Sequence, residues 1–295
     1  MAANPLGTHV QVWEGGWTPE AVRRAAAGAA AAGYAFLELP VRAPQTVDAD
    51  AIARILADAG LTCTASFIHT PATDIAGDDT DVAAKGEALM IEALAKARDL
   101  GSSRLVGAWH SSLAKHDRPR GAAGRQRAID ILARVAGRAR DMGLVMCCEA
   151  LNRYESNFVN TAAQALALIE AIGADNLTVH LDTFHMNIEE ADPAAAIRAC
   201  GRRLGYLHVA ENDRGYLGTG SIDFGAIFRA LADIGYGGPI ALEVFSSAVV
   251  NAEHSARLAI WRQTWSDSAD MAGHAHAFLT SQMETAARRS PGSVP

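Results

Sequence analysis

The sequence predicts a (β/α)8 barrel with a C-terminal helical extension. Eight short runs rich in β-branched and apolar residues alternate with alanine-rich segments of helical periodicity, and no long linker interrupts them. The chain of 295 residues has room for the roughly 250 residues of such a barrel. We therefore expect residues 1–295 to form a single domain, with residues 251–288 as the extension. A doubly wound open sheet is the alternative, but no G-x-G-x-x-G motif follows the first run, which weakens its dinucleotide-binding form.

The individual elements follow from local patterns along the chain. Thr18-Pro19 and Asp192-Pro193 indicate helix starts, because an N-cap side-chain oxygen and a proline in the first turn both suit a helix N-terminus. The glycines in "AAGY", "DAGL", "DLGS", "DMGL" and "DIGY" stand where helices stop before the next strand. In "YLGTGSIDF", Asp223 is expected to cap the following helix. Strands are expected at residues 9–13, 35–40, 61–68, 104–109, 144–149, 177–182, 204–210 and 239–245.

Composition narrows the classes of function. The net charge is −7, from 33 acidic and 26 basic residues, so no general attraction to nucleic acid or anionic lipid is expected. The first residues lack a basic and apolar leader, and no run approaches the roughly 20 apolar residues of a membrane span. We therefore expect a cytoplasmic protein without a membrane or nucleic-acid partner. Its four cysteines fall within apolar segments, which predicts reduced core thiols at Cys63, Cys147, Cys148 and Cys200.

Four consecutive strands are expected to carry potential metal ligands at their carboxyl ends. They supply Glu149, Asp182, His208 and Glu243. In a (β/α)8 barrel the carboxyl ends of the strands form the active-site face, so these side chains would converge. Buried carboxylates without a partner are costly, and a divalent cation at the point where they meet offsets that cost. Three carboxylates and one imidazole make a hard donor set that suits Mn²⁺, Mg²⁺ or Co²⁺.

The segments around these residues resemble those of a known enzyme family. The strings "CCEALNRYESN", "LDTFHMNIEE" and "ENDRGYLGTGSIDF", followed by an acid in the last strand, are similar to the ketose 3-epimerases of the xylose isomerase-like superfamily of sugar isomerases and epimerases. The resemblance implies a divalent metal ion, with Mn²⁺ as the leading candidate, held by the four residues named above. It also implies that Glu149 and Glu243 move the proton, and that Glu155, His185 and Arg214 bind oxygens of the sugar.

The expected reaction is epimerisation at C3 of a free ketohexose or ketopentose, such as tagatose, allulose, fructose or ribulose. Inverting that carbon requires removal of a proton alpha to the carbonyl and delivery of a proton to the opposite face of the planar enediolate. Glu149 and Glu243 are expected on separate strands and could serve one face each. A cation on the sugar oxygens would stabilise the developing negative charge. A homodimer or homotetramer is also expected.

Other functions remain compatible with the pattern. An aldose–ketose isomerase or a keto-inositol dehydratase on the same barrel would differ in which carbon exchanges its proton. A catalytically silent carbohydrate-binding barrel would keep the metal only for stability, but it needs no base on each face. His69 and His110 follow the third and fourth strands, where the related apurinic endonucleases place metal-binding histidines. Because Asp213-Arg214-Gly215 lacks that family's second imidazole and no basic stripe is present, an apurinic endonuclease-like hydrolase of DNA is a weaker alternative. For His69 and His110, a polar role at the barrel mouth is favoured over a second metal.

Overall fold

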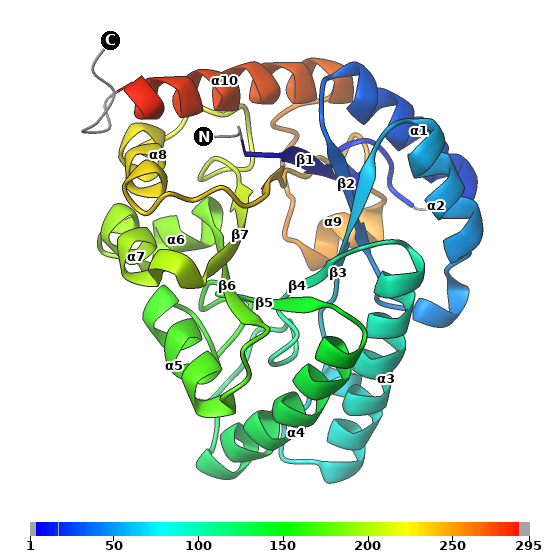
Figure 1. Ribbon diagram of the computed structural model, residues 1–295, viewed down its shortest axis with the longest axis vertical. Helices are drawn as coiled ribbons and strands as arrows, with labels where there is room; N and C mark the ends of the chain where they lie inside the picture. The colour runs from blue at the N-terminus through cyan, green and yellow to red at the C-terminus, as the bar shows by residue number, and fades with distance from the viewer. Residues whose placement is uncertain (1–3, 17, 289–295) are drawn as a thin grey trace.

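The computed structural model describes residues 4–16 and 18–288, which fold into a closed barrel of eight parallel strands surrounded by helices (Figure 1). Neighbouring strands in the barrel are neighbours in sequence, and the last strand pairs with the first. The predicted (β/α)8 class is confirmed. The strands are β1 (Leu6–His9), β2 (Phe36–Pro40), β3 (Thr62–Ser66), β4 (Arg104–Gly107), β5 (Val145–Glu149), β6 (Leu177–Asp182), β7 (Leu204–Val209) and β8 (Ile240–Leu242).

The helices form a ring around the barrel, and α10 lies between α8 and α1 in that ring (Figure 1). The helix starts predicted at Thr18 and Asp192 are confirmed, because each side chain accepts a hydrogen bond from the first turn. Tyr34 OH donates to Ala272 O at 2.9 Å and ties α10 to the segment before β2. The α-helices are α1 (Pro19–Ala31), α2 (Ala49–Asp58), α3 (Thr80–Asp99), α4 (Ala122–Asp141), α5 (Ala162–Ile172), α6 (Thr183–Glu189), α7 (Pro193–Cys200), α8 (Phe224–Asp233), α9 (Ala252–Arg257) and α10 (Ser268–Arg288), and the 3-10 helices are η1 (Val10–Val12), η2 (Pro44–Thr46), η3 (Pro71–Thr73) and η4 (Gly201–Arg203).

The first strand differs from the prediction at residues 9–13. Strand β1 ends at His9, and the next three residues form η1. The alternation in "HVQVW" favours a strand, but the His9 ring accepts a hydrogen bond from Gln11 N and caps the 3-10 turn. Upstream, Gly7 leaves room for the Phe36 ring of β2, which occupies the space that a Cβ would need. The cap of η1 therefore ends the strand where the alternation of the sequence would have continued it.

Two hydrophobic clusters stabilise the barrel. The larger one packs the helices against the outer faces of the strands. The smaller one consists of Phe36, Val106, Cys147, Tyr206 and Ala241, one from each of five strands. All four cysteines are free and buried, as predicted. Within residues 4–16 and 18–288, no helix combines the length and the apolar character needed to cross a membrane.

Candidate active site

The predicted metal ligands meet at the carboxyl end of the barrel. Glu149 and Asp182 end β5 and β6, His208 lies in β7, and Glu243 directly follows β8. Each of the four residues offers one side-chain nitrogen or oxygen atom as a ligand, and these four atoms all lie within 4.8 Å of one another. The structure therefore brings together all four residues to which the sequence pattern pointed.

A layered arrangement inside the barrel explains this convergence. Side chains two positions apart on a strand point to the same face. The residues of the smaller apolar cluster on four of the strands are Phe36, Cys147, Tyr206 and Ala241. Two positions later on the same chain segments stand Glu38, Glu149, His208 and Glu243. The apolar cluster is thus the floor of a polar layer that opens toward the carboxyl end.

Asp182 is an ionised, fixed carboxylate in this layer. Burial alone would raise its pKa, but the nearby Arg214, His185 and His208 together with the hydrogen bond from Phe184 N outweigh that effect, and the pKa falls to about 2. Arg214 Nη2 lies 3.0 Å from Asp182 Oδ2 and 3.0 Å from Glu243 Oε2. Asp182 Oδ1 accepts a hydrogen bond from Phe184 N at the start of α6, which orients the carboxylate.

The two glutamates have raised pKa values. Burial raises the pKa of Glu243 to about 7, because the positive charge of His208 and Arg214 only partly offsets it. Burial raises the pKa of Glu149 as well. Their main chains are held by side chains, since Arg214 Nη1 donates to Glu243 O at 2.7 Å and His110 Nε2 donates to Glu149 O at 2.8 Å. A carboxyl group that titrates near neutral pH can both accept and release a proton in a reaction.

His208 presents a buried ring nitrogen, Nδ1, that makes no hydrogen bond. Asp182 Oδ2 is also buried and makes no hydrogen bond, but it is paired with the Arg214 guanidinium at 3.0 Å. His208 Nδ1 lies 3.4 Å from Glu149 Oε1 and 3.5 Å from Glu243 Oε2. Buried polar atoms are normally paired, so an unpaired ring nitrogen that faces two carboxylates indicates a ligand between them. Because three carboxylates and one imidazole form a hard donor set, the residues fit a divalent cation.

The predicted sugar-binding residues lie around the same centre. His185 Nε2 is 3.6 Å from Asp182 Oδ2. Its Nδ1 accepts hydrogen bonds from Asn152 N at 3.2 Å and Asn152 Nδ2 at 2.8 Å, so in the neutral ring Nε2 carries the proton. Glu155 Oε1 accepts a hydrogen bond from the same Asn152 amide at 2.9 Å. The third of these residues, Arg214, is already bound to two of the ligand carboxylates.

The structure adds two buried residues that the sequence patterns did not identify. Glu38 of β2 is 1% exposed, and its Oε2 accepts hydrogen bonds from His208 Nε2 and Tyr206 OH, both at 2.7 Å. The ring nitrogens of His180 in β6 make no hydrogen bond, and Nε2 lies 3.9 Å from Glu149 Oε1. A charged residue within the apolar run "FLELP" was the available signal for Glu38.

His69 and His110 are fully buried, and the polar role at the barrel mouth that we expect for them stays a prediction. The segments after β3 and β4 run parallel, with a bridge between His69 and Ser112. Burial lowers the pKa of His69 to about 3 and that of His110 to about 4, which keeps both rings neutral at neutral pH. Neither ring belongs to a group with metal-ligand spacing among the described residues.

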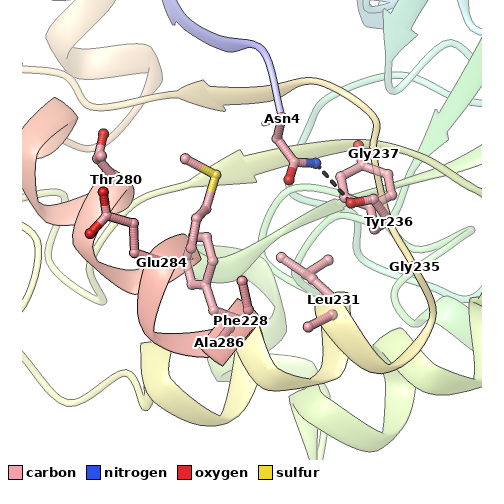
Figure 2. Close-up of a pocket in the computed structure, with 12 residues that line it drawn as sticks. Asn4, Phe228, Leu231, Gly235, Tyr236, Gly237, Thr280, Glu284 and Ala286 are labelled. Atoms are coloured by element: carbon pink, nitrogen blue, oxygen red, sulfur yellow. Dashed lines mark hydrogen bonds between the residues drawn. The ribbon is translucent and has the colours of Figure 1, made fainter. Parts of the chain in front are cut away.

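A separate cavity lies at the amino-terminal end of the barrel (Figure 2). It measures about 280 Å³ and lies between α8 and the last turns of α10, beside the segments that precede β1 and β8. Phe228 and Met283 contribute apolar surface, and Asn4 Nδ2 donates to Tyr236 O at 3.0 Å. Glu284 is the one carboxylate among the described residues that line it. Since the cavity has no converging titratable groups, the candidate for chemistry is the opposite end.

Known proteins share this architecture and sequence. The profile of the family described as xylose isomerase-like TIM barrel matches residues 26–272. A ketose 3-epimerase from Arthrobacter globiformis is 40% identical over 278 residues, which cover 94% of this chain and 96% of that protein. An L-ribulose 3-epimerase from Mesorhizobium japonicum is 41% identical over 288 residues, which cover 97% of this chain and 96% of that protein. The crystal structure of a D-allulose 3-epimerase from Methylomonas sp. in complex with D-allulose matches with a TM-score of 0.92 and 39% sequence identity. The match covers 95% of this chain and 97% of that chain.

The closed barrel with its polar carboxyl end is therefore a xylose isomerase-like TIM barrel. Relatives at about 40% identity span almost the whole chain and are named as 3-epimerases. The chain belongs to the ketose 3-epimerase family and is a carbohydrate epimerase. The resemblance based on the sequence motifs is confirmed.

Proposed function

We propose that this chain epimerises a free ketose at C3, with Glu149 and Glu243 exchanging the proton beside a bound divalent cation. The observation that carries the proposal is the pair of glutamates at the ends of β5 and β8, the first buried and the second only partly exposed, which lie around one centre and have raised pKa values. The names of the relatives, which act on a ketose, L-ribulose and D-allulose, support a ketohexose or a ketopentose as substrate.

The proposed cation site consists of Glu149, Asp182, His208 and Glu243, whose donor atoms lie within 4.8 Å of one another. When bound, the cation would polarise the sugar carbonyl and stabilise negative charge on its oxygens. Mn²⁺ is the leading candidate, with Co²⁺ and Mg²⁺ as alternatives, because most of the donors are oxygen atoms.

Glu149 and Glu243 are proposed to act on opposite faces of the sugar. Strands β6 and β7 separate their strands in the barrel, so a planar enediolate between them would present one face to each carboxylate. One glutamate removes the proton from C3, and the other returns a proton to the opposite face, which inverts the carbon. The hydrogen bonds from His110 and Arg214 to the two backbone carbonyls keep the carboxylates in position.

Glu155, His185 and Arg214 are proposed to bind the sugar oxygens. His185 supplies an N–H donor and Glu155 an acceptor, and the Asn152 amide holds both. Arg214 supplies a cation that also pairs with two of the ligand carboxylates. We therefore expect Arg214 to couple sugar binding to the geometry of the proposed metal centre.

The reaction is tested by the fate of the proton at C3. In D₂O with Mn²⁺, NMR of sugars recovered from a panel of free ketoses should show deuterium at C3 of the epimer and almost none at C1. Glu149→Gln and Glu243→Gln should each abolish epimerisation, because inversion needs a group on each face. Label at C1 alone would indicate an aldose–ketose isomerase, and a Glu149→Gln enzyme that epimerises at the parent rate would exclude the two-base reaction.

The metal content of single-residue variants tests which residues bind the metal and which bind the sugar. Asp182→Ala and His208→Ala should lower the Mn²⁺ content measured by elemental analysis, because each removes a proposed ligand. His185→Ala should keep about one ion per chain and lose turnover. Loss of the ion from the His185 variant would instead place that imidazole on the metal.

We further propose that the chain acts as a single barrel domain and forms a homodimer or homotetramer in the cytoplasm. Limited proteolysis should leave one resistant core, and light scattering should give the mass of two or four chains. A monomer mass over the whole concentration range would contradict the proposed assembly.

A further inference from the structure

A buried carboxylate lies beside the candidate metal centre and contacts one of its ligands. Glu38 Oε2 is 2.7 Å from His208 Nε2 and 2.7 Å from Tyr206 OH. The Glu38 side chain is 1% exposed, and no step of the proposed reaction uses it. A carboxylate this deep is costly to bury and requires a compensating function or partner.

The hydrogen bond from His208 determines which of its ring nitrogens is available. A carboxylate accepts hydrogen bonds and does not donate them, so when His208 gives up one proton to bind a cation, the proton that remains is on Nε2. Nδ1 then keeps its lone pair. This nitrogen faces Glu149 and Glu243 at 3.4 and 3.5 Å and makes no hydrogen bond. The hydrogen bond to Glu38 therefore leaves the Nδ1 lone pair of His208 directed at Glu149 and Glu243.

Groups on two other strands hold Glu38 in this place. Tyr206 OH donates to the same oxygen atom that accepts from His208. On the other side, His9 Nε2 lies 4.0 Å from Glu38 Oε1. Since His9 Nδ1 accepts a hydrogen bond from Gln11 N, its proton is on Nε2 and faces the carboxylate. Glu38 is thus a fixed acceptor and not a mobile side chain.

We propose that Glu38 is a positioning residue for the metal centre, which fixes the tautomer and ring orientation of His208 and strengthens it as a ligand. Second carboxylates that accept the free N–H of a metal-binding histidine typically contribute 10- to 100-fold to metal affinity. The inference rests on the proposed function, because it requires a cation at this centre.

The experiment compares three variants of the full chain, each stripped of metal and titrated with Mn²⁺ by calorimetry. Glu38→Ala removes the acceptor and should raise the Kd for Mn²⁺ by about 10- to 100-fold. Glu38→Gln keeps an oxygen for both hydrogen bonds and removes the charge, so its Kd should rise less, by about 3- to 10-fold. Tyr206→Phe is the matched control, because it removes the other hydrogen bond to the same oxygen but leaves His208 paired with the charged carboxylate, so its Kd should rise less than that of Glu38→Gln.

A spectroscopic readout separates ligand orientation from general stability. The visible bands of the Co²⁺-loaded protein should shift in Glu38→Gln and stay unchanged in Tyr206→Phe, because only the first variant alters the His208 ligand. If Glu38→Ala does not fold, the comparison of Glu38→Gln with Tyr206→Phe decides the matter. Parent-like Kd values and Co²⁺ bands in Glu38→Gln would overturn the role of Glu38 alone. A parent protein that binds neither Mn²⁺ nor Co²⁺ would overturn the proposed metal site itself.

Discussion

Asn152 joins two of the residues that we assign to the sugar. Its Nδ2 lies 2.8 Å from His185 Nδ1 and 2.9 Å from Glu155 Oε1. In Asn152→Asp a carboxylate of the same shape would draw a proton onto His185 Nδ1 and repel Glu155. We expect kcat/KM to fall by at least about tenfold, or ~1.4 kcal/mol of transition-state stabilisation. The Mn²⁺ content should not change.

Asn160→Asp is the matched control for that variant. Asn160 lies in the same loop, and its Nδ2 donates to Leu151 O and Ser156 O instead of to site residues. It should alter the stability of the loop more than turnover. Parent-like kcat/KM in Asn152→Asp would contradict the assignment, and equal losses in both variants would attribute the effect to the loop.

His110 is expected to make stability depend on pH. Its pKa is lowered from 6.5 to about 4, because burial disfavours the charged ring. Between these values the unfolded chain binds a proton that the folded chain does not, so the free energy of unfolding falls as the pH falls. The loss is ~1.4 kcal/mol for each pH unit and at most about 3 kcal/mol. Denaturant unfolding of the chelated protein at a series of pH values measures it.

His110→Gln isolates this contribution, because the glutamine retains an N–H donor for Glu149 O. Its free energy of unfolding should depend less steeply on pH between 6.5 and about 4 than that of the parent. Above pH 7 the two proteins should differ by a constant amount. Equal slopes in the lower window would show that the ring is not the group that titrates.

The metal ligands at the carboxyl ends of the strands could be predicted from the sequence, but the contact between Glu38 and His208 in the same layer could not. Glu149 and Asp182 each follow an apolar run, so their position along the chain also gives their end of the barrel. Glu38 and His208 are 170 positions apart in the sequence. They meet because β2 and β7 curve into one closed barrel, and no local pattern specifies that contact.

The start of α8 depends on Asp223, the cap that the sequence predicts. Asp223 Oδ1 accepts a hydrogen bond from Ala226 N at 2.8 Å. Asp223→Ala should therefore lower the free energy of unfolding by about 1 kcal/mol, the usual effect of losing an N-cap. Asp223→Asn retains a capping oxygen and should stay within about 0.5 kcal/mol of the parent. Urea unfolding tests both, and an alanine variant as stable as the parent would show that water replaces the cap.

Helix starts were easier to predict than the first strand, because a cap is a local interaction. Thr18, Asp192 and Asp223 each bond within their own first turn. In contrast, Val10 and Val12 alternate as in a strand, but both are fully buried in η1. Strand β1 pairs with β2 only as far as His9. Where that pairing ends depends on contacts between strands that are far apart in the sequence, so the alternation of neighbouring residues alone does not predict it.

The two ends of the whole molecule differ in charge. The amino-terminal end carries the largely apolar cavity of Figure 2. The carboxyl end gathers the carboxylates of Glu38, Glu149, Asp182 and Glu243 around the guanidinium of Arg214. With these carboxylates ionised, this part of the barrel interior has an excess of negative charge. Such an excess opposes folding unless protons or a cation neutralise it.

A bound cation is therefore expected to stabilise the barrel as a whole. Its proposed ligands come from β5, β6, β7 and the end of β8, so unfolding separates them and releases the ion. A ligand present at 100 times its Kd adds about 2.7 kcal/mol when it binds only the folded chain. For a chain of this size, that gain raises Tm by ~5 °C.

Scanning calorimetry of the chelated protein, with and without Mn²⁺, measures this shift. Asp182→Asn is the control, because the variant keeps the shape of the ligand and loses its charge, so Mn²⁺ should raise its Tm by much less. A Tm that rises equally in parent and variant would place the stabilising ion elsewhere on the chain. A parent Tm that does not respond to Mn²⁺, Co²⁺ or Mg²⁺ would mean that protons and Arg214 alone neutralise the carboxylates of the barrel.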